Sequence, residues 1–419
     1  MILLGAILVL LTVFGAPLFA VIAAGAMLGY QKEGIDLMAI AIELLGISQM
    51  PFLSAIPLFT FAGYLLSESN APSRLVRLTN AILGWMPGGL ALVALAACAF
   101  FTAFTGASGV TIIALGAILY PALKQDGYPD NFNLGLITTS GSLGLLFAPS
   151  LPLILYGVVA EISIDNLFRA GALPGLLMLI LLAGYSLWVN RQYRKPLRSF
   201  SGREVAAALN DAKWELPLPV VVLGGIYSGY FAVSEAAAVT ALYVLLVEVA
   251  ILREIRLGDL PKVMRESMLL VGGILIVLGV SLASTNYMID AGVPQLLLAY
   301  TTGFVSSQAG FLFLMLIFLL ILGAILDIFS AIVLVVPLIL PIAAQYGVNE
   351  FHLGIVFLAA MQLGYLTPPV GLNLFIASYR FEKPIMTVYS ATFPFLMILL
   401  LSVILIMYWP ELSLMLVPN

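Results

Sequence analysis

Long, predominantly apolar stretches constrain the fold of this chain more than any other feature. The clearest are 170–190, 266–289, 352–378 and 386–409, and 132–158 and 216–252 are two more, the latter broken near Gly229. A helix needs about 20 apolar residues to cross a bilayer. Only 9% of the 419 residues are charged, where an ordinary soluble domain has about 25%. The sequence therefore predicts an all-α polytopic membrane protein.

The composition excludes several kinds of site. Cys98 is the only cysteine and His352 the only histidine. A disulfide framework and a Cys/His metal site within one chain are therefore excluded. No basic patch with interleaved aromatic residues indicates a nucleic-acid partner. With one histidine and no pair of carboxylates converging in a polar segment, the chain is not predicted to be an enzyme.

The basic residues orient the predicted spans. Six of them lie in the 190–215 loop, four between 253 and 265, and two at Arg380 and Lys383. Loops rich in Lys and Arg face the cytoplasm. Counting spans from these loops places all 17 basic residues inside except Lys32 and Arg169. We therefore expect a multi-pass protein of a bacterial inner membrane, surrounded by lipid, with both termini in the periplasm.

Two apolar segments do not fit as single spans. The segment 89–123 is interrupted at GASGVT (106–111), and 308–343 is interrupted around Asp327. The flanks of the first segment are both assigned to the cytoplasm and those of the second to the periplasm, so each is predicted to form a re-entrant helical hairpin. Irregular backbone at membrane depth is tolerated only when it is buried in protein or lines a cavity.

Glycine and proline recur at a spacing of about 220 residues. Matched positions are Pro121 and Pro341, Gly144 and Gly364, and the pairs Pro149-Ser150 and Pro368-Pro369. The predicted chain between the copies crosses the membrane an odd number of times, so the copies are inverted. Inverted repeats with broken helices are typical of secondary transporters, whose sites lie at the repeat interface. The alternative is that Gly and Pro are simply frequent in membrane helices.

The breaks gather oxygen atoms suited to a hard monovalent cation. Ser108 with the 140–144 segment is predicted to form one sodium site, and Asp327 or Ser330 with Gly364 and Thr367 its inverted counterpart. Carbonyls at half-helix C-termini can ligate cations, and N–H groups at N-termini attract anions. The alternative is that these hydroxyls bond back to helix carbonyls. The predicted sodium ligands are Gly106, Ser108, Thr111, Ser142, Gly144, Asp327, Ser330, Gly364 and Thr367.

Asp327 is the most informative acid, since it lies within an apolar run. A charge at the bilayer centre costs about 3 kcal/mol on insertion scales. Three roles remain open for it: ligating a cation, exchanging a proton, or capping the second half of the hairpin. Glu235, at the break near Gly229, is predicted to brace two helices rather than to act directly in transport.

Five strings together resemble one family. They are GASGVT and ALGAILYPAL (106–111 and 114–123), APSLPLILYG (148–157), SGYFAVSEAAAV (228–239) and TPPVGLNLF (367–375). With them the chain resembles, over essentially its whole length, the large membrane (DctM-like) subunit of TRAP transporters, the tripartite ATP-independent periplasmic transporters. The sequence departs from the family pattern at Ala107, where a second small hydroxyl residue is usual, at Ala148 and at 232–235.

The resemblance implies the ion-transporter superfamily and an elevator mechanism, in which a transport domain slides against a scaffold. The transport domain is expected to comprise 89–158 (first hairpin and broken helix) and 308–378 (second hairpin and broken helix). The other parts are expected to be scaffold helices and an arm (1–88), a helix with a cytoplasmic linker (159–213), further scaffold helices with an arm (214–307), and a final helix (379–419).

The resemblance also implies partners and cargo. We expect a small four-helix membrane subunit as a separate chain, a periplasmic substrate-binding protein, sodium as the coupling ion, and no other cofactor. The cargo is expected to be an organic anion with a carboxylate, such as a dicarboxylate or sialic acid. Alternatives are a self-sufficient sodium/anion symporter, a channel or a membrane receptor. The expected substrate contacts are Pro149, Ser150, Pro369 and Asn373.

Electrostatics set the expected coupling. The intramembrane segments carry no Arg or Lys to neutralise an anion, and half-helix N-termini can bind one without supplying work. Moving one negative charge into a cell at −100 mV costs about 2.3 kcal/mol. We therefore expect uptake to be driven by more than one sodium ion.

Overall fold

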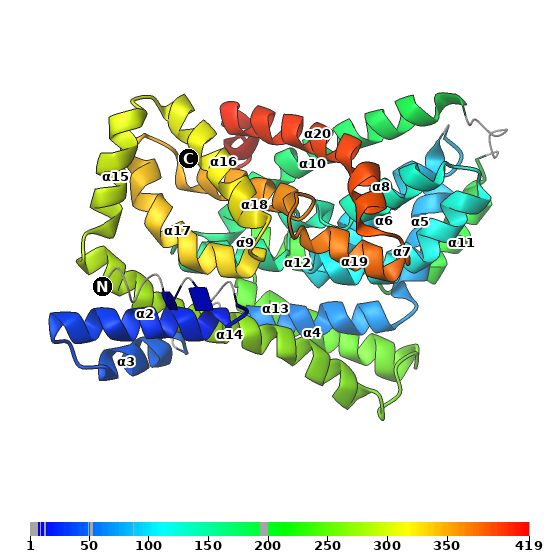
Figure 1. Cartoon of the computed structure of the whole chain (residues 1–419). Coiled ribbons are helices and arrows are strands. Elements are labelled where there is room, and N and C mark those ends of the chain that lie inside the picture. Colours follow the sequence, from blue (N-terminus) through cyan, green and yellow to red (C-terminus); the bar gives the residue numbers. More distant parts are fainter. Residues whose placement is uncertain are drawn as a thin grey trace.

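The computed structural model describes residues 7–8, 10–11, 14–48, 50, 53–86, 88–192 and 200–418, and their regular structure is entirely helical (Figure 1). Among these residues, six helices are long and apolar enough to cross a membrane, or up to eight if each bent pair counts as one span. The predicted all-α polytopic fold is confirmed. The six are α7 (Ser108–Gln125), α10 (Ile164–Val189), Val233–Ile251, α14 (Leu260–Asp290), α17 (Ile328–Gln345) and α20 (Ile385–Tyr408).

Both predicted hairpins are present as helix pairs that break where the sequence indicated. Each pair is followed by a broken helix. In the first copy these elements are α6 (Gly89–Thr105), α7, α8 (Asp130–Ser140), the short η1 (Leu143–Leu146) and α9 (Leu151–Val159). In the second copy they are α16 (Gln308–Gly323), α17, α18 (Glu350–Gly364) and α19 (Leu372–Arg380).

The helix boundaries confirm the repeat. Helix α7 spans 108–125 and α17 spans 328–345, so both of their ends lie 220 residues apart, and α8 and α18 begin at 130 and 350. The packing is also reciprocal, because α7 packs on α19 as α17 packs on α9, and α8 packs on α20 as α18 packs on α10. Contacts that exchange when the two copies are swapped are what an approximate two-fold axis between repeats produces.

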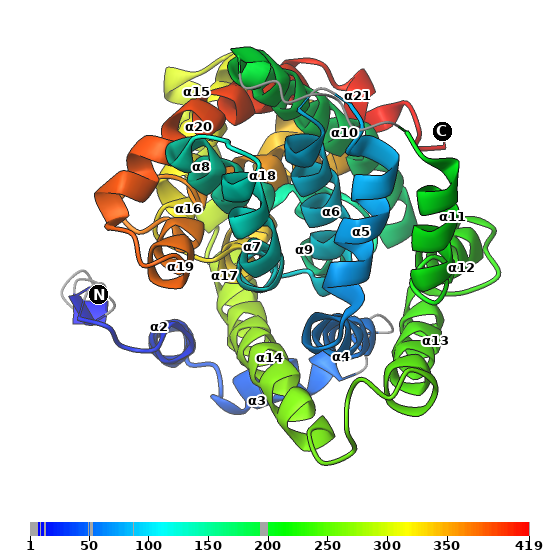
Figure 2. The ribbon, with the colours of Figure 1, turned by 90° about the vertical axis from the view of Figure 1, so that its right-hand side faces the viewer.

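The remaining helices surround these units. Helices α4 and α14 pack against each other, and α14 also packs against α2, α3 and α17. In both views α2, α3, α4 and α14 lie below the hairpins and broken helices (Figures 1 and 2). The remaining bounds are α2 (Leu18–Glu33), α3 (Met38–Ile47), α4 (Ala55–Glu68), α5 (Ala71–Leu83), η2 (Asn190–Gln192), α11 (Gly202–Asp211), α12 (Pro217–Tyr227), α13 (Val233–Leu245), η3 (Leu246–Ile251), α15 (Val293–Phe304) and α21 (Glu411–Leu414).

Proline and glycine account for the breaks. The predicted span over 352–378 is not one helix, because it is divided between α18 and α19 at Pro368 and Pro369, which lack the N–H that a continuing helix requires. The stretch 216–252 divides at Gly229, which has φ 71°. Glu235 accepts the N–H of Ala232 at 2.9 Å and thereby caps α13; this local role replaces the predicted bracing of two helices.

The half-helices that lead into the two breaks form the centre of the protein. Every residue of α8 from 132 to 140, and every residue of α18 from 352 to 364, is buried. A helix that is buried on all sides loses the polar face of a surface helix. Polar side chains that occur on these two segments are therefore held inside the protein, next to the breaks.

Candidate functional site

The tip of the first hairpin is a tight turn between α6 and α7. Gly106 ends α6 with φ 64°, a conformation that glycine adopts without steric cost. Ala107 occupies the N-cap position of α7 and has no side-chain acceptor, so no side chain caps this helix. A Cβ atom on Gly106 would lie 2.6 Å from Cγ of Leu151. The tip is therefore packed tightly against the start of α9.

A hydrogen bond joins this tip to the other repeat. Ser108 Oγ donates to Asn373 Oδ1 at 2.7 Å, and Asn373 Nδ2 donates to the carbonyl of Thr138 at 3.4 Å. Asn373 belongs to the first turn of α19, so the starts of α7, α9 and α19 meet around the first tip. No side chain caps α9 or α19 either. Uncapped helix N-termini present N–H groups and positive potential, which favour an anion.

Threonine hydroxyls lie on the inner side of the same break. Thr102 Oγ1 donates to the carbonyl of Gly141 at 2.9 Å and lies 2.7 Å from Thr111 Oγ1. A Cβ atom on Gly141 would lie 3.2 Å from the Ser108 carbonyl oxygen. The structure thus brings Ser108 and Thr111 next to the 140–144 segment; sodium binding by these groups stays a prediction.

Two buried hydroxyls at this break have no hydrogen-bond partner among the described residues, those of Thr105 and Thr139. Ser142, a predicted ligand, donates instead to the Thr139 carbonyl at 3.2 Å. Thr102 and Thr139 were not selected from the sequence. The run of hydroxyl residues Thr138-Thr139-Ser140 directly before Gly141 is a sequence signal from which Thr139 could have been predicted.

The second hairpin tip carries a charge at the matching place. Asp327 is the N-cap residue of α17, and its Oδ1 accepts the N–H groups of Phe329 and Ser330 at 3.0 and 3.1 Å. Its Oδ2 accepts the hydroxyl of Ser330 at 2.6 Å. The capping role left open by the sequence is therefore realised. Because a carboxylate has about four acceptor positions, these three bonds still leave the Asp327 carboxylate able to bind a cation.

The second tip is tied to the break of its own repeat. The carbonyl of Ala324 accepts the N–H groups of Val370 and Gly371 at 3.2 and 3.3 Å, and Ile328 donates its N–H to the Tyr365 hydroxyl at 2.9 Å. Gly364 lies directly against Gly323, so that a Cβ atom on either would meet the backbone of the other. The segment with Asp327 and Ser330 is therefore adjacent to the one with Gly364 and Thr367.

Three of the predicted sodium ligands, Gly144, Gly364 and Thr367, already form hydrogen bonds with nearby backbone groups. The carbonyl of Gly364 accepts the Thr367 N–H at 3.0 Å, just as that of Gly144 accepts the Phe147 N–H at 3.0 Å. Thr367 Oγ1 donates to the Leu363 carbonyl at 2.9 Å. A carbonyl oxygen has two lone pairs, so each glycine carbonyl keeps one acceptor position after this bond.

A cavity of about 280 Å³ lies between the second tip and α14. Asp327, Phe329 and Ser330 line one side, and an apolar stretch of α14 lines the other: Leu269, Leu270, Gly273, Ile274 and Val277. Asp327 is exposed, and its carboxylate is the only charged group in this lining. The cavity therefore favours a cation over an anion at this tip.

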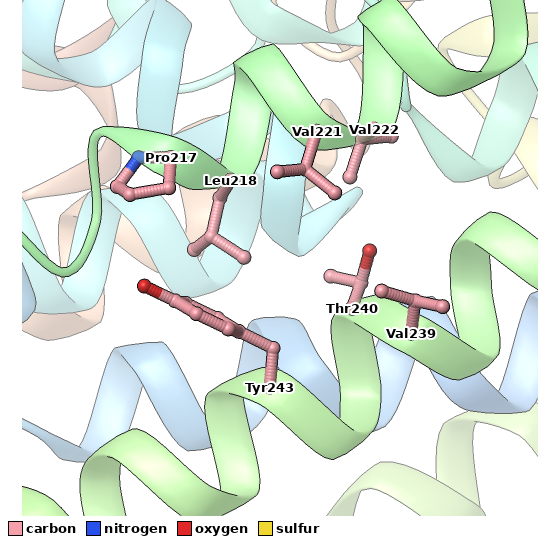
Figure 3. Close-up of a pocket in the computed structure, with 7 residues that line it drawn as sticks. All are labelled: Pro217, Leu218, Val221, Val222, Val239, Thr240 and Tyr243. Atoms are coloured by element: carbon pink, nitrogen blue, oxygen red, sulfur yellow. The ribbon is translucent and has the colours of Figure 1, made fainter.

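A second cavity, of about 30 Å³, lies between α12 and α13 (Figure 3). This volume is enough for about one water molecule. The figure shows Pro217, Leu218, Val221 and Val222 facing Val239, Thr240 and Tyr243. Thr240 donates to its own helix, and the Tyr243 hydroxyl donates to the Trp214 carbonyl. The cavity is therefore too small and too apolar for a polar solute.

The four predicted substrate contacts fall in different surroundings. Pro149 and Ser150 are buried, and Ser150 Oγ donates to the Leu145 carbonyl at 2.5 Å. Asn373 is buried, whereas Pro369 is exposed and its carbonyl accepts the Tyr389 hydroxyl at 3.0 Å. The first tip brings together the starts of α9 and α19, next to Ser150 and Asn373; Pro369 lies nearer the second tip.

Sequence reasoning also missed Gln362. It is fully buried on α18, and neither amide atom has a hydrogen-bond partner among the described residues. It lies 220 residues after Ser142, at the matching place before the break. Its sequence context, a single Gln between Met361 and Leu363, carried no signal of its own.

Comparison with known proteins gives one family. The family model described as "Tripartite ATP-independent periplasmic transporter, DctM component" matches residues 4–412. The C4-dicarboxylate TRAP transporter large permease protein DctM of Pseudomonas aeruginosa is 36% identical over 382 residues, covering 91% of this chain and 89% of that protein. The ectoine/5-hydroxyectoine large permease UehC of Ruegeria pomeroyi is 31% identical, covering 97% and 96%.

Two further similarities bear on organisation and fold. The isethionate permease DctMQ of Oleidesulfovibrio alaskensis is 32% identical over 397 residues, which cover 94% of this chain but 61% of that longer protein. The solved structure of the Alcanivorax borkumensis YdaH transporter superposes with a TM-score of 0.61 at 13% identity, covering 90% of this chain and 89% of that one. At this identity the likeness supports the fold alone.

Proposed function

Because the chain belongs to the DctM component family of tripartite ATP-independent periplasmic transporters, as a large permease, we propose that it imports an organic carboxylate together with sodium ions. One observation carries the proposal beyond the family: the two hairpin tips differ in electrostatic character. The uncapped starts of α7, α9 and α19 meet at Ser108 and Asn373, and the start of α17 carries Asp327.

The first tip is the proposed anion subsite. Around it the ligands are N–H groups and neutral side chains, including the Asn373 amide and the Ser108 hydroxyl. Helix N-termini bind carboxylates through N–H groups and partial positive charge. Relatives are named for C4-dicarboxylates, isethionate and ectoine. We propose C4-dicarboxylates as the first class to assay.

The second tip, with its cavity against α14, is the proposed entry to a sodium site. Hard cations take oxygen ligands, and Asp327, Ser330 and the carbonyls near Gly364 supply them. The proposed counterpart in the first repeat uses the carbonyls and hydroxyls around Ser108 and 140–144. The unpartnered hydroxyls of Thr105 and Thr139 extend that set of ligands.

The proposed movement is of elevator type. Residues 89–158 and 308–378 form the moving unit, and α4, α13 and α14 belong to the part against which it slides. The supporting feature is the apolar stretch of α14 facing the second tip, since an apolar surface carries no polar groups that must exchange partners during sliding. The proposed partners are a small membrane subunit, as a separate chain, and a periplasmic binding protein that delivers the substrate.

The charge balance sets the proposed stoichiometry. Each sodium ion recovers about 2.3 kcal/mol from a potential of −100 mV, and each negative charge costs the same. Two sodium ions therefore balance a dianion, and net inward positive charge needs at least three for a dianion or two for a monoanion. Uptake should accordingly require sodium and be faster when the interior is negative.

The test is uptake into proteoliposomes that contain this chain, the small subunit and a loaded binding protein. Uptake should require both the sodium gradient and the binding protein. Equal accumulation with and without the gradient would refute sodium coupling. Uptake that needs no binding protein would instead identify a self-sufficient symporter. A reporter that works only in the periplasm should be active when it is fused after position 419. If only a reporter that works in the cytoplasm is active at this position, the proposed orientation is wrong.

A further inference from the structure

Arg74 on α5 is surrounded by three glutamates from a distant part of the chain. Its Nε donates to Glu215 Oε1 at 2.5 Å, and its Nη2 lies 3.4 Å from Glu248 Oε1. Its Nη1 bonds Glu254 Oε1, while Glu254 Oε2 accepts the N–H of Asn70 at 2.7 Å. One guanidinium thus links α5 to the start of α12, to η3 and to the loop that follows η3.

The cluster holds more negative charge than Arg74 can balance. Glu215 and Glu248 are only 3% and 1% exposed. Each uses Oε1 toward Arg74, and each has a buried Oε2 without a hydrogen-bond partner among the described residues. An ionised oxygen that is buried and unpaired is strongly disfavoured. These two oxygens therefore indicate a further positive charge or a proton at this place.

Glu248 is held in position by its backbone. It belongs to the π-helical turn η3 within the candidate span Val233–Ile251. Its carbonyl accepts the N–H groups of Glu254 and Ile255 at 2.9 and 3.3 Å. π-Helical turns and ionisable residues within membrane spans both occur preferentially at functional positions. The side chain of Glu248 is buried in this turn and faces Arg74.

The surroundings suit a proton better than a metal ion. No group of three or more His, Cys, Asp or Glu in the described part of the chain is placed to hold a metal ion, and Ca²⁺ takes six to eight oxygen ligands. Two carboxylates that share one site retain a proton because both cannot easily ionise. We propose that Glu215 and Glu248 share one proton, forming a pH-dependent link between α5, α12 and η3 that is separate from both hairpin tips.

All charged and titratable groups around the pair act on its proton affinity. Among the residues that the structure describes, these are Arg74 and Glu254, with Tyr243, whose hydroxyl donates to the Trp214 carbonyl, and the neutral hydroxyl of Ser69 near Glu248. Burial raises the pKa of Glu215 more than the hydrogen bond and charge of Arg74 lower it. Although burial acts in the opposite direction, bonds from Asn70 and Arg74 lower the pKa of Glu254, so Glu254 remains the ionised partner of Arg74.

The sign of the pH effect follows from linkage. The pKa of Glu215 is raised in the folded protein, so between its unfolded and folded pKa values the folded state binds more protons than the unfolded state. Stability then falls as pH rises through this window. Loss of the proton leaves two unpaired carboxylates beside one arginine, and the link between α5 and η3 weakens as pH rises on the side it faces, the cytoplasm in the proposed orientation.

The test is infrared spectroscopy of the purified full-length protein across a pH series. The expected result is a band of a protonated, buried carboxyl near neutral pH that disappears at alkaline pH. The band should be absent in Glu248→Gln and in Glu215→Gln, and unchanged in Glu266→Gln, whose side chain on α14 is partly exposed and lies near Lys262. A wild-type protein without the band, a band kept in both cluster variants, or a band displaced by added Na⁺ or Mg²⁺ at constant pH would overturn the proposal.

A second measurement needs no variant and no transport assay. An apolar carbodiimide reacts with protonated carboxyls, and mass spectrometry locates the modified residue in wild-type protein. Modification at Glu215 or Glu248 near neutral pH, decreasing at alkaline pH, is expected. Modification restricted to other acids would contradict the shared proton. Both measurements are independent of sodium-coupled uptake, so failure of one proposal leaves the other standing.

Discussion

The two hairpin tips occupy matched positions in the repeat but differ in electrostatic potential. Ala107 and Asp327, 220 residues apart, are the N-cap residues of α7 and α17. Ala107 leaves the α7 N-terminus uncapped, and Asp327 covers that of α17 with a carboxylate. A duplicated backbone therefore provides two similar helix starts, and a single side chain decides whether each start favours an anion or a cation.

The tips also differ in what they bond. The first tip crosses to the other repeat through Ser108 and Asn373. The second tip bonds its own broken helix through Ala324 and Tyr365, and opens toward α14. The first tip is thus built into the interface between repeats, where transporter substrates bind, and the second lies at the boundary with the proposed scaffold.

Introducing a negative charge at the first tip should have the largest effect on uptake. Ala107→Asp places a carboxylate beside the proposed anion subsite. At about 5 Å and an effective dielectric of about 20, the repulsion is about 3 kcal/mol, on the order of a hundredfold loss of uptake. Ala107→Asn, which can cap α7 without a charge, is the control and should retain most uptake. Normal uptake by the Asp variant in proteoliposomes would show that the anion does not bind at this tip.

Neutralising the second tip should have the next largest effect. Asp327→Asn keeps a good N-cap but removes the charge from the cavity against α14. Hydrogen bonds and contacts to charged groups contribute about 1.5–3 kcal/mol, so the sodium concentration for half-maximal uptake should rise roughly tenfold or more. Asp290→Asn, at the exposed end of α14, is the control. An unchanged sodium dependence would leave Asp327 as a cap alone.

Cutting the link between the repeats should cost less. Asn373→Leu, which copies Leu153 at the matching place in the first repeat, removes both bonds of the amide to Ser108 and Thr138. The bond to Thr138 is long, at 3.4 Å, so the two bonds together contribute about 1 kcal/mol, and uptake should fall roughly fivefold. The buried Ser402, which bonds only its own helix, provides Ser402→Ala as the control. Equal uptake by both variants would make the link dispensable.

Removing single hydroxyls should have the smallest effect and should show which tip holds sodium. Ser108→Ala and Thr367→Ala should each raise the sodium concentration for half-maximal uptake by about twofold to fivefold, the value of roughly one ligand or hydrogen bond, and more when combined. An effect of only one change would place the ion at that tip. If the double variant keeps the wild-type sodium dependence, the assignment of both sodium sites is wrong.

Local features of the sequence determined the helices and their breaks. Glycine and proline act on their own backbone, so Gly106, Gly229, Pro368 and Pro369 mark breaks without knowledge of any neighbour. The spacing of about 220 residues likewise appears in the residues themselves and returns as the matched bounds of α7 and α17. The apolar stretches and the family-like strings needed no tertiary information either.

Only the tertiary structure decided which polar groups meet. Ser108 and Asn373 lie 265 residues apart, and Arg74 lies 141 to 180 residues from its three glutamate partners. Gln362, a single amide between two apolar residues, gave no separate signal in the sequence. In a soluble protein, apolar periodicity tells which face of a helix is buried. In this chain most helices are apolar on every face, since lipid and protein interior select the same side chains, so the pairing of helices emerges only from their packing.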